Sequence, residues 1–181
     1  MRVQIGALCI ALITVGAFIA IPLPGSPVPI VLQNMFVVFT GLVLSPLWAS
    51  LTLLVYLLLG ALGLPVFAGA AGGLGHFAGP TGGFLLGFLP AAWVTSLVMR
   101  LGRVDSSPHT AGFVRRIAAV SLGFLSIYIV GVPRLAAVAD LSIVRTLWIG
   151  FIPFLPGDIV KAAVLLILLR TLPGSLWRSW T

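Results

Sequence analysis

Long apolar runs, separated by short clusters of proline, glycine and charge, dominate this chain. Between Arg2 and Arg100 there is no lysine, arginine, aspartate or glutamate, so positions 3–99 are uncharged. A membrane-spanning helix needs about 20 mostly apolar residues, so this stretch is long enough for four spans and their loops. Proline and glycine mark the ends of the runs, because neither continues a helix readily. The pattern predicts six spans, over residues 5–21, 30–44, 47–64, 84–99, 117–132 and 156–170, the last ending between 170 and 172.

Composition excludes a soluble domain. Hydrophobic residues make up 60% of the 181 positions and charged residues only 7%, whereas soluble domains carry about 25% charged residues. We therefore predict an all-α membrane protein, a compact bundle of six transmembrane helices that forms a single domain over residues 1–181. The chain starts like a signal peptide, but no A-x-A site follows and further spans do, so we expect no cleavage. The lone Cys9 indicates neither a disulfide framework nor a metal site.

The arginines predict the orientation, because cytoplasmic loops carry an excess of positive charge. With the amino terminus inside, both termini are cytoplasmic, and the cytoplasmic arginines are Arg2, Arg100, Arg103, Arg115, Arg116, Arg170 and Arg178. Only Arg134 and Arg145 then lie outside, with Asp140 between them. Basic residues scattered at membrane edges do not indicate nucleic-acid binding, despite the net charge of +7. The proline-rich loop 22–27 and the glycine-rich segment 69–83 share the outer face, and segment 135–154 is predicted to be a lid or an interfacial half-helix.

The most informative pair is Asp158 and Lys161, which is the only lysine of the chain. An ionisable pair at membrane depth indicates a functional site, because burying charge beside lipid is unfavourable. Asp158 precedes Arg170 by twelve residues, or about 18 Å of helix, which puts the pair in the outer half of the membrane. Side chains at i and i+3 share a helix face, so the pair offers a strong acceptor beside a strong donor. The alternatives are an internal ion pair that neutralises itself and a lysine that snorkels to the interface.

Other residues are weaker candidates for a functional role. Gln33 and Asn34 are amides in an apolar stretch that either bond to neighbouring backbone or point into a pocket. The glycines of segment 69–83 either pack closely or form a wall whose N–H groups approach an anionic ligand; His76 within it is expected to be a loop residue rather than a ligand. Ala7 and Ala11 form a small-xxx-small pair that permits close helix contact.

Four motifs in order resemble the BioY family, the biotin-binding S components of energy-coupling-factor (ECF) vitamin transporters. They are PVPIVLQN at 27–34, YLLLGALGLPVFAG at 56–69, GPTGGFLLGF at 79–88 and PGDIVK at 156–161, and the resemblance covers nearly the whole chain. Two departures are that the position of Phe84 is often tyrosine in the family and that His76-Phe77-Ala78 replaces a more aliphatic stretch.

The resemblance implies uptake of biotin across the cytoplasmic membrane by a multi-pass chain that is not an enzyme and has no cofactor. The implied partners are a membrane-embedded coupling (T) protein and cytoplasmic ATPases that hydrolyse ATP, and Ala7-x-x-x-Ala11 resembles the motif that docks on the coupling protein. Members of the family also occur without neighbouring partners, so a chain that functions without these partners is an alternative. The implied biotin-binding residues are Asp158, Lys161, Gln33, Asn34, Gly73 and Phe84.

Biotin has a cyclic urea at one end and a carboxylate at the other. We expect Asp158 to accept from a urea N–H and Lys161 to donate to the urea oxygen, because the two side chains are too close together to serve both ends. Phe84 would cover the rings, and backbone N–H groups of the glycine-rich segment would receive the carboxylate. The competing assignment pairs Lys161 with the carboxylate. One alternative function is an S component for another small vitamin. Another is an intramembrane hydrolase. The hydrolase is disfavoured because Asp105 and Asp140 are both expected in loops and because His76 and His109 are expected on opposite sides of the membrane.

Overall fold

The computed structural model describes residues 1–101 and 109–171, and it is almost entirely helical. The predictions made for Arg103, Asp105, Leu172 and Arg178 fall outside these residues. The helices are α1 (Arg2–Phe18), α2 (Gln33–Val43), α3 (Pro46–Ala61), α4 (Gly75–Ala78), α5 (Gly82–Arg100), α6 (His109–Ala139), α7 (Ile143–Gly150) and α8 (Leu155–Thr171), with a 3-10 turn η1 (Ile152–Phe154) before α8. Two short strands, β1 (Ala20–Ile21) and β2 (Ile30–Val31), complete the described fold.

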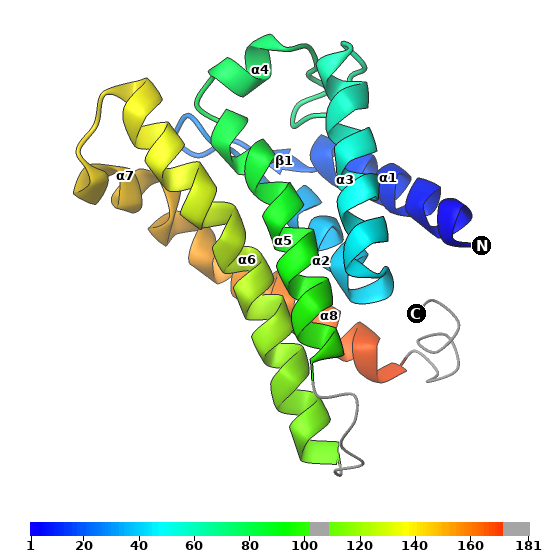
Figure 1. Cartoon of the computed structure of the whole chain (residues 1–181). Helices are drawn as coiled ribbons and strands as arrows, with labels where there is room; N and C mark the ends of the chain where they lie inside the picture. The colour runs from blue at the N-terminus through cyan, green and yellow to red at the C-terminus, as the bar shows by residue number, and fades with distance from the viewer. Residues whose placement is uncertain (102–108, 172–181) are drawn as a thin grey trace.

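Helix α5 is the central element of the bundle. It packs against α6, α2 and α3, while α1 packs against α2 and α3, and α8 contacts α6 and α2. Figure 1 shows α5 and α6 side by side along the length of the molecule, with α4 and its flanking loops gathered at one end. The connections at that end are therefore positioned above the interior between the helices.

Three stretches are long and apolar enough to cross a membrane: Gly82–Arg100, Gly112–Ala139 and Ile143–Arg170. The apolar helices α1, α2 and α3 are shorter than this. The prediction of an all-helical membrane protein is thus confirmed in its coarse form. The count of six spans and the position of both termini stay predictions.

Glycines allow the central helices to approach closely. A Cβ at Gly41 of α2 would lie 2.4 Å from the carbonyl oxygen of Ala92 in α5, and one at Gly131 of α6 would lie 2.4 Å from the Phe84 ring. Small residues are the usual means of close helix packing in membranes, where apolar burial between helices gives little driving force. Close packing at these glycines brings the start of α5 against α6, where the candidate site lies.

The boundary of the second span differs from the prediction. The sequence predicts helix over residues 5–21 and 30–44, but β1 pairs antiparallel with β2 in the register Ala20↔Val31 and Ile21↔Ile30. The proline-rich loop is therefore the tip of a hairpin. Val28 and Val31, which follow this loop in the hairpin, are buried. Such short apolar strands have no periodicity that separates them from helix ends.

The fifth predicted span, 117–132, is shorter than the helix in the structure. Helix α6 runs from His109 to Ala139 and passes through Pro133, because a proline inside a membrane helix is tolerated where neighbouring groups satisfy the freed backbone. Residues 135–139 thus belong to α6, and the remainder of the predicted lid segment forms α7 and η1. Helix α7 begins after Ser142, whose hydroxyl accepts the N–H of Arg145.

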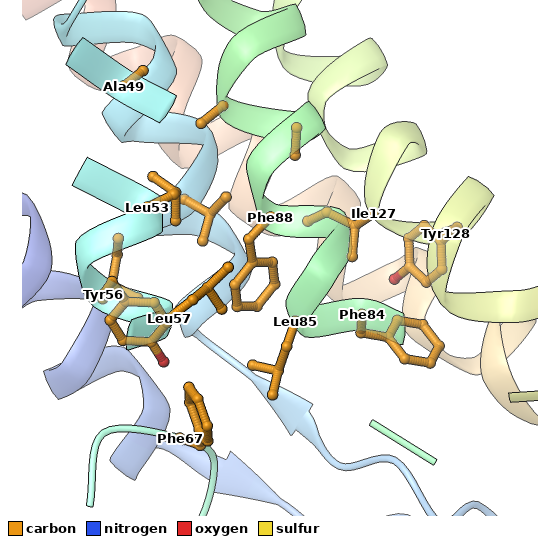
Figure 2. Close-up of a cluster of buried hydrophobic side chains, with 14 of the residues drawn as sticks. Ala49, Leu53, Tyr56, Leu57, Phe67, Phe84, Leu85, Phe88, Ile127 and Tyr128 are labelled. Carbon is orange, nitrogen blue, oxygen red and sulfur yellow. The ribbon is translucent and has the colours of Figure 1, made fainter. Parts of the chain in front are cut away.

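Replacing Gly60 by alanine is expected to destabilise the fold. A Cβ there would lie 2.1 Å from the ring of Phe67, which is 2% exposed and packs edge-on against Tyr56 and Phe77. Figure 2 shows Phe67 beside the Tyr56 ring. Overpacking of this kind costs about 1–3 kcal/mol. The measurement is the thermal unfolding midpoint of the purified chain, with Gly75→Ala as matched control, since nothing lies within 4 Å of a Cβ at Gly75; equal midpoints for the two variants would contradict the packing described.

Candidate functional site

The two ionisable residues predicted from the sequence form a buried ion pair in the first turns of α8. The Lys161 Nζ lies 2.9 Å from the Asp158 Oδ1, and the two residues are 7% and 6% exposed. The second carboxylate oxygen, Oδ2, accepts a hydrogen bond from the Tyr128 hydroxyl of α6. Both oxygens of Asp158 therefore have partners, and a chain of polar contacts links α6 to α8 in an otherwise apolar interior.

Aromatic rings hold Tyr128 in place. Its ring meets Phe151 at a centroid distance of 4.8 Å and Phe84 at 6.1 Å, both edge-on, and lies 6.5 Å from Phe154. Edge-to-face contacts of this kind are favourable and directional. Figure 2 shows Phe84 and Tyr128 on adjoining turns of α5 and α6. The segment around η1 thus supplies two rings that orient the Tyr128 hydroxyl toward Asp158.

An inner cavity of about 40 Å³ lies beside Tyr128. A water molecule takes about 30 Å³ in the liquid, so this space is small for a ligand and must widen to accept one. Its polar side chains come from the starts of α2 and α5 and from α6, and the rest of the wall is apolar. The lining residues are Val28, Pro29, Val31, Gln33, Asn34, Ala68, Thr81, Phe84, Leu85, Phe88, Tyr128 and Phe154.

Gln33 is held by a relay of hydrogen bonds. Its Nε2 donates to the Tyr56 hydroxyl, which donates in turn to the Val66 carbonyl oxygen at 2.7 Å. Gly16 makes room for this position, because a Cβ there would lie 2.9 Å from the Gln33 backbone nitrogen. The side chain bonds to α3 rather than to neighbouring backbone, so it serves as a rigid wall of the inner cavity.

Asn34 differs from its neighbour in having no partner. It is 9% exposed and lines the inner cavity, yet within residues 1–101 and 109–171 its side-chain amide makes no hydrogen bond. Its amide atoms are accessible, since the enclosed side-chain nitrogen or oxygen without a partner among the described residues is Arg115 Nε. The Asn34 amide is therefore available to a molecule in the cavity.

A second, outer cavity of about 300 Å³ adjoins the first and is lined by Pro27, Pro29, Phe67, Ala68, His76, Pro80, Thr81 and Leu85. Pro29, Ala68, Thr81 and Leu85 belong to both walls. Ligand pockets typically occupy about 300–1,000 Å³, so the outer cavity alone reaches the lower end of that range. The two cavities thus share part of their walls and lie between the hairpin and α4 on one side and Tyr128 on the other.

Asp158 faces a different space. It lines a groove of about 310 Å³ between α6 and α8, together with Tyr128, Phe151 and other mostly apolar residues. Tyr128 is common to this groove and to the inner cavity. Its ring thus stands between the inner cavity and the ion pair, and its hydroxyl must release Asp158 before a ligand in the inner cavity can contact the carboxylate.

The structure does not bring Gly73 to either cavity. Its N–H donates to the Gly60 carbonyl oxygen at 2.7 Å, and the N–H groups of Gly69 and Gly79 donate to Ala17 and Gly75 at 3.3 and 3.2 Å. These donors of the glycine-rich segment satisfy the chain's own carbonyl groups. These three N–H groups are therefore engaged within the chain, and the assignment of the ligand carboxylate to this segment, with Gly73 as a site residue, stays a prediction.

Ala7 and Ala11 lie on the outside of the bundle. Both are exposed on α1, while Gly6, Cys9 and Ile13 form the buried face of that helix. Ala7 also lines a shallow groove of about 230 Å³ that α1 shares with Trp48 of α3. The pair therefore does not serve packing within the bundle.

Sequence reasoning missed Tyr128 and Thr81. The chain has only two tyrosines, Tyr56 and Tyr128, and both stand within predicted apolar spans. A buried tyrosine hydroxyl usually finds a partner, so this was a usable signal. Within the part of the chain that the structure describes, no group of three or more His, Cys, Asp and Glu side chains could hold a metal ion.

Comparison with known proteins gives consistent similarities. The BioY family model matches residues 2–178. The chain is 40% identical over 174 residues to a protein of Pyrococcus horikoshii described as a probable biotin transporter BioY, covering 96% of this chain and 97% of that one. It is 39% identical to the biotin transporter BioY of Rhodobacter capsulatus, covering 93% and 90%. A crystal structure of the S-component for biotin from an ECF-type ABC transporter aligns with a TM-score of 0.85 at 28% identity, covering 96% of this chain and 92% of that one.

Proposed function

The chain belongs to the BioY family, and from this premise we propose that it takes up biotin as the S component of an ECF-type transporter. The observation that carries the proposal is a pair of adjoining cavities, the inner of which is lined by Tyr128, the partner of the buried Asp158–Lys161 pair. We take the two cavities to be the path of the ligand. An apolar pocket with a few convergent polar groups is the usual form of a small-molecule site. Relatives that resemble nearly the whole chain are described as biotin transporters.

We place the site in the outer half of the cytoplasmic membrane, within a single integral-membrane domain of six spans with both termini inside. Arginines support this orientation. Arg115 donates to the Leu101 carbonyl oxygen and Arg170 lies over the Phe113 ring, so the end of α5, the start of α6 and the end of α8 form one positively charged end. Cytoplasmic ends carry such an excess of positive charge, and the cavities lie toward the opposite ends of α5 and α6.

The urea of biotin is assigned to the inner end of the path. Asp158 accepts from a urea N–H once the Tyr128 hydroxyl has moved, and Lys161 donates to the urea oxygen. The free amide of Asn34 supplies a further polar contact, Gln33 forms a rigid wall, and Phe84 covers the apolar rings.

The competing pairing of Lys161 with the biotin carboxylate has less support. The ammonium is 2.9 Å from Asp158, so its charge is already balanced. A neutral urea, which offers both donor and acceptor, matches a closed ion pair better than a second anion does.

The proposed partners are a membrane-embedded coupling protein and cytoplasmic ATPase subunits that hydrolyse ATP, so the chain itself is not an enzyme and needs no cofactor. The exposed Ala7 and Ala11 are proposed to contact the coupling protein, because small residues let two helices approach closely. An intramembrane hydrolase has little support, since Asp140, at the connection of α6 and α7, does not line the cavities around Asp158.

Equilibrium binding of labelled biotin to the purified chain tests the function. We expect saturable binding that unlabelled biotin competes away and that other small vitamins do not. Saturable binding of a different vitamin, with none of biotin, would overturn the proposal in favour of an S component with another substrate.

A further inference from the structure

Polar side chains are unevenly distributed in the outer cavity. Its wall is built mainly from prolines, Phe67, Ala68 and Leu85, and the side chains that can donate a hydrogen bond are His76 and Thr81. His76 is half-buried and belongs to the four-residue helix α4. The sequence alone indicated a loop residue there, but the structure turns it into part of the cavity wall.

The outer cavity adjoins the inner one, since Pro29, Ala68, Thr81 and Leu85 are common to both walls. It is therefore the space toward which a ligand whose urea lies at the inner end would extend its acid tail. An anion there needs donors, since a desolvated carboxylate without partners is strongly unfavourable. The backbone N–H groups of Gly69, Gly73 and Gly79 already donate to the chain's own carbonyl groups. Among the side chains that line the outer cavity, His76 and Thr81 are the candidates for these donors.

His76 is well positioned for this purpose. Its ring meets the buried Phe67 ring edge-on at a centroid distance of 6.0 Å, which restrains its orientation. Helix α4 also lies against a positive charge, because Arg134 donates to the carbonyl oxygens of Phe77 and Ala78 at 3.4 and 3.5 Å. The outer end thus offers an imidazole donor on a short helix whose carbonyl end is held by a guanidinium.

We propose that His76, together with the Thr81 hydroxyl, forms the subsite for the ligand carboxylate and makes this chain prefer the acid over neutral derivatives. The inference rests on the proposed binding of biotin and adds the residues that recognise its acid group. Lys161 has no part in this preference, because its charge is balanced by Asp158.

The experiment compares biotin with its neutral primary amide in equilibrium binding to the purified full chain. His76→Ala is expected to weaken biotin binding about tenfold, the usual range for losing a hydrogen bond to a charged group, and to change amide binding by less than about twofold. His76→Gln keeps a donor and is expected to retain part of the preference for the acid. His109→Ala is the matched control. His109 begins α6, about 38 Å of helix before Arg134, and it is Arg134 that contacts the helix of His76.

Each outcome decides between the alternatives. If His76→Ala still prefers the acid over the amide, this subsite is overturned, while the proposed binding of biotin stands. If the preference is lost in Lys161→Ala instead, the carboxylate is bound by the Lys161 ammonium. If His76→Ala weakens the binding of biotin and of the amide equally, His76 serves the fold rather than recognition. His76→Gln would then weaken the binding of both ligands equally as well. Absence of saturable biotin binding in the unaltered chain would instead reject the proposed function.

Discussion

Replacing Asp158 by asparagine is expected to weaken biotin binding by about tenfold or more. The change removes the acceptor charge that we assign to a urea N–H. It also leaves the Lys161 ammonium, 7% exposed, without its counter-ion and alters the group that accepts from the Tyr128 hydroxyl. Equilibrium binding of labelled biotin to the purified variant measures the effect, and the thermal unfolding midpoint shows how much of it arises from the fold.

Asp140→Asn is the matched control for this substitution. Asp140 lies between α6 and α7 at a φ of +50°, a conformation that asparagine adopts readily, so the variant is expected to bind biotin normally. The double variant Asp158→Asn with Lys161→Met then separates the two roles of the pair. Replacing a buried ion pair by neutral groups of similar volume is often neutral for stability. If binding returns in the double variant, the pair only neutralises itself and our assignment of Asp158 to the urea is wrong.

Replacing Ala7 by tryptophan is expected to abolish biotin uptake in cells while leaving biotin binding by the purified chain unchanged. Ala7 is exposed on α1, so the bundle can accommodate the larger ring on its outside. A closely approaching partner helix cannot, because small residues are what permits that approach. Ala11→Trp is expected to act in the same way, since Ala11 is exposed one turn further along α1.

Ile129→Trp is the control for a large aromatic residue on the outside of the bundle. Ile129 is 64% exposed on α6, on a different helix from the proposed docking pair (Figure 1), and its variant is expected to support uptake. Co-purification of the chain with the coupling protein gives a second measurement, which should fail for Ala7→Trp and succeed for Ile129→Trp. Loss of biotin binding in Ala7→Trp would place the alanine inside the bundle and contradict the docking surface.

The uncharged stretch, and the prolines and glycines that interrupt it, determined where most of the helices lie. The predicted spans 47–64 and 84–99 correspond to Pro46–Ala61 and Gly82–Arg100 within three residues at each end. These boundaries are local, because proline and glycine act on the backbone where they stand. Charge in an apolar run identified Asp158 and Lys161 for a similar reason: an ionisable side chain at membrane depth is unfavourable wherever the chain folds.

The tertiary structure decided what depends on contacts between distant segments. Pairing of β1 with β2 shortened the second span, and continuation of α6 through Pro133 depended on its surroundings. The position of Tyr128 between the inner cavity and the ion pair, the free amide of Asn34 and the entry of His76 into the outer cavity all arise where separate elements meet. The same holds for Gly73, whose N–H is engaged by Gly60. Sequence alone determined which residues are chemically capable of binding a ligand, whereas packing decided which of them face a cavity, because a hydrogen bond made within the fold removes a donor from recognition.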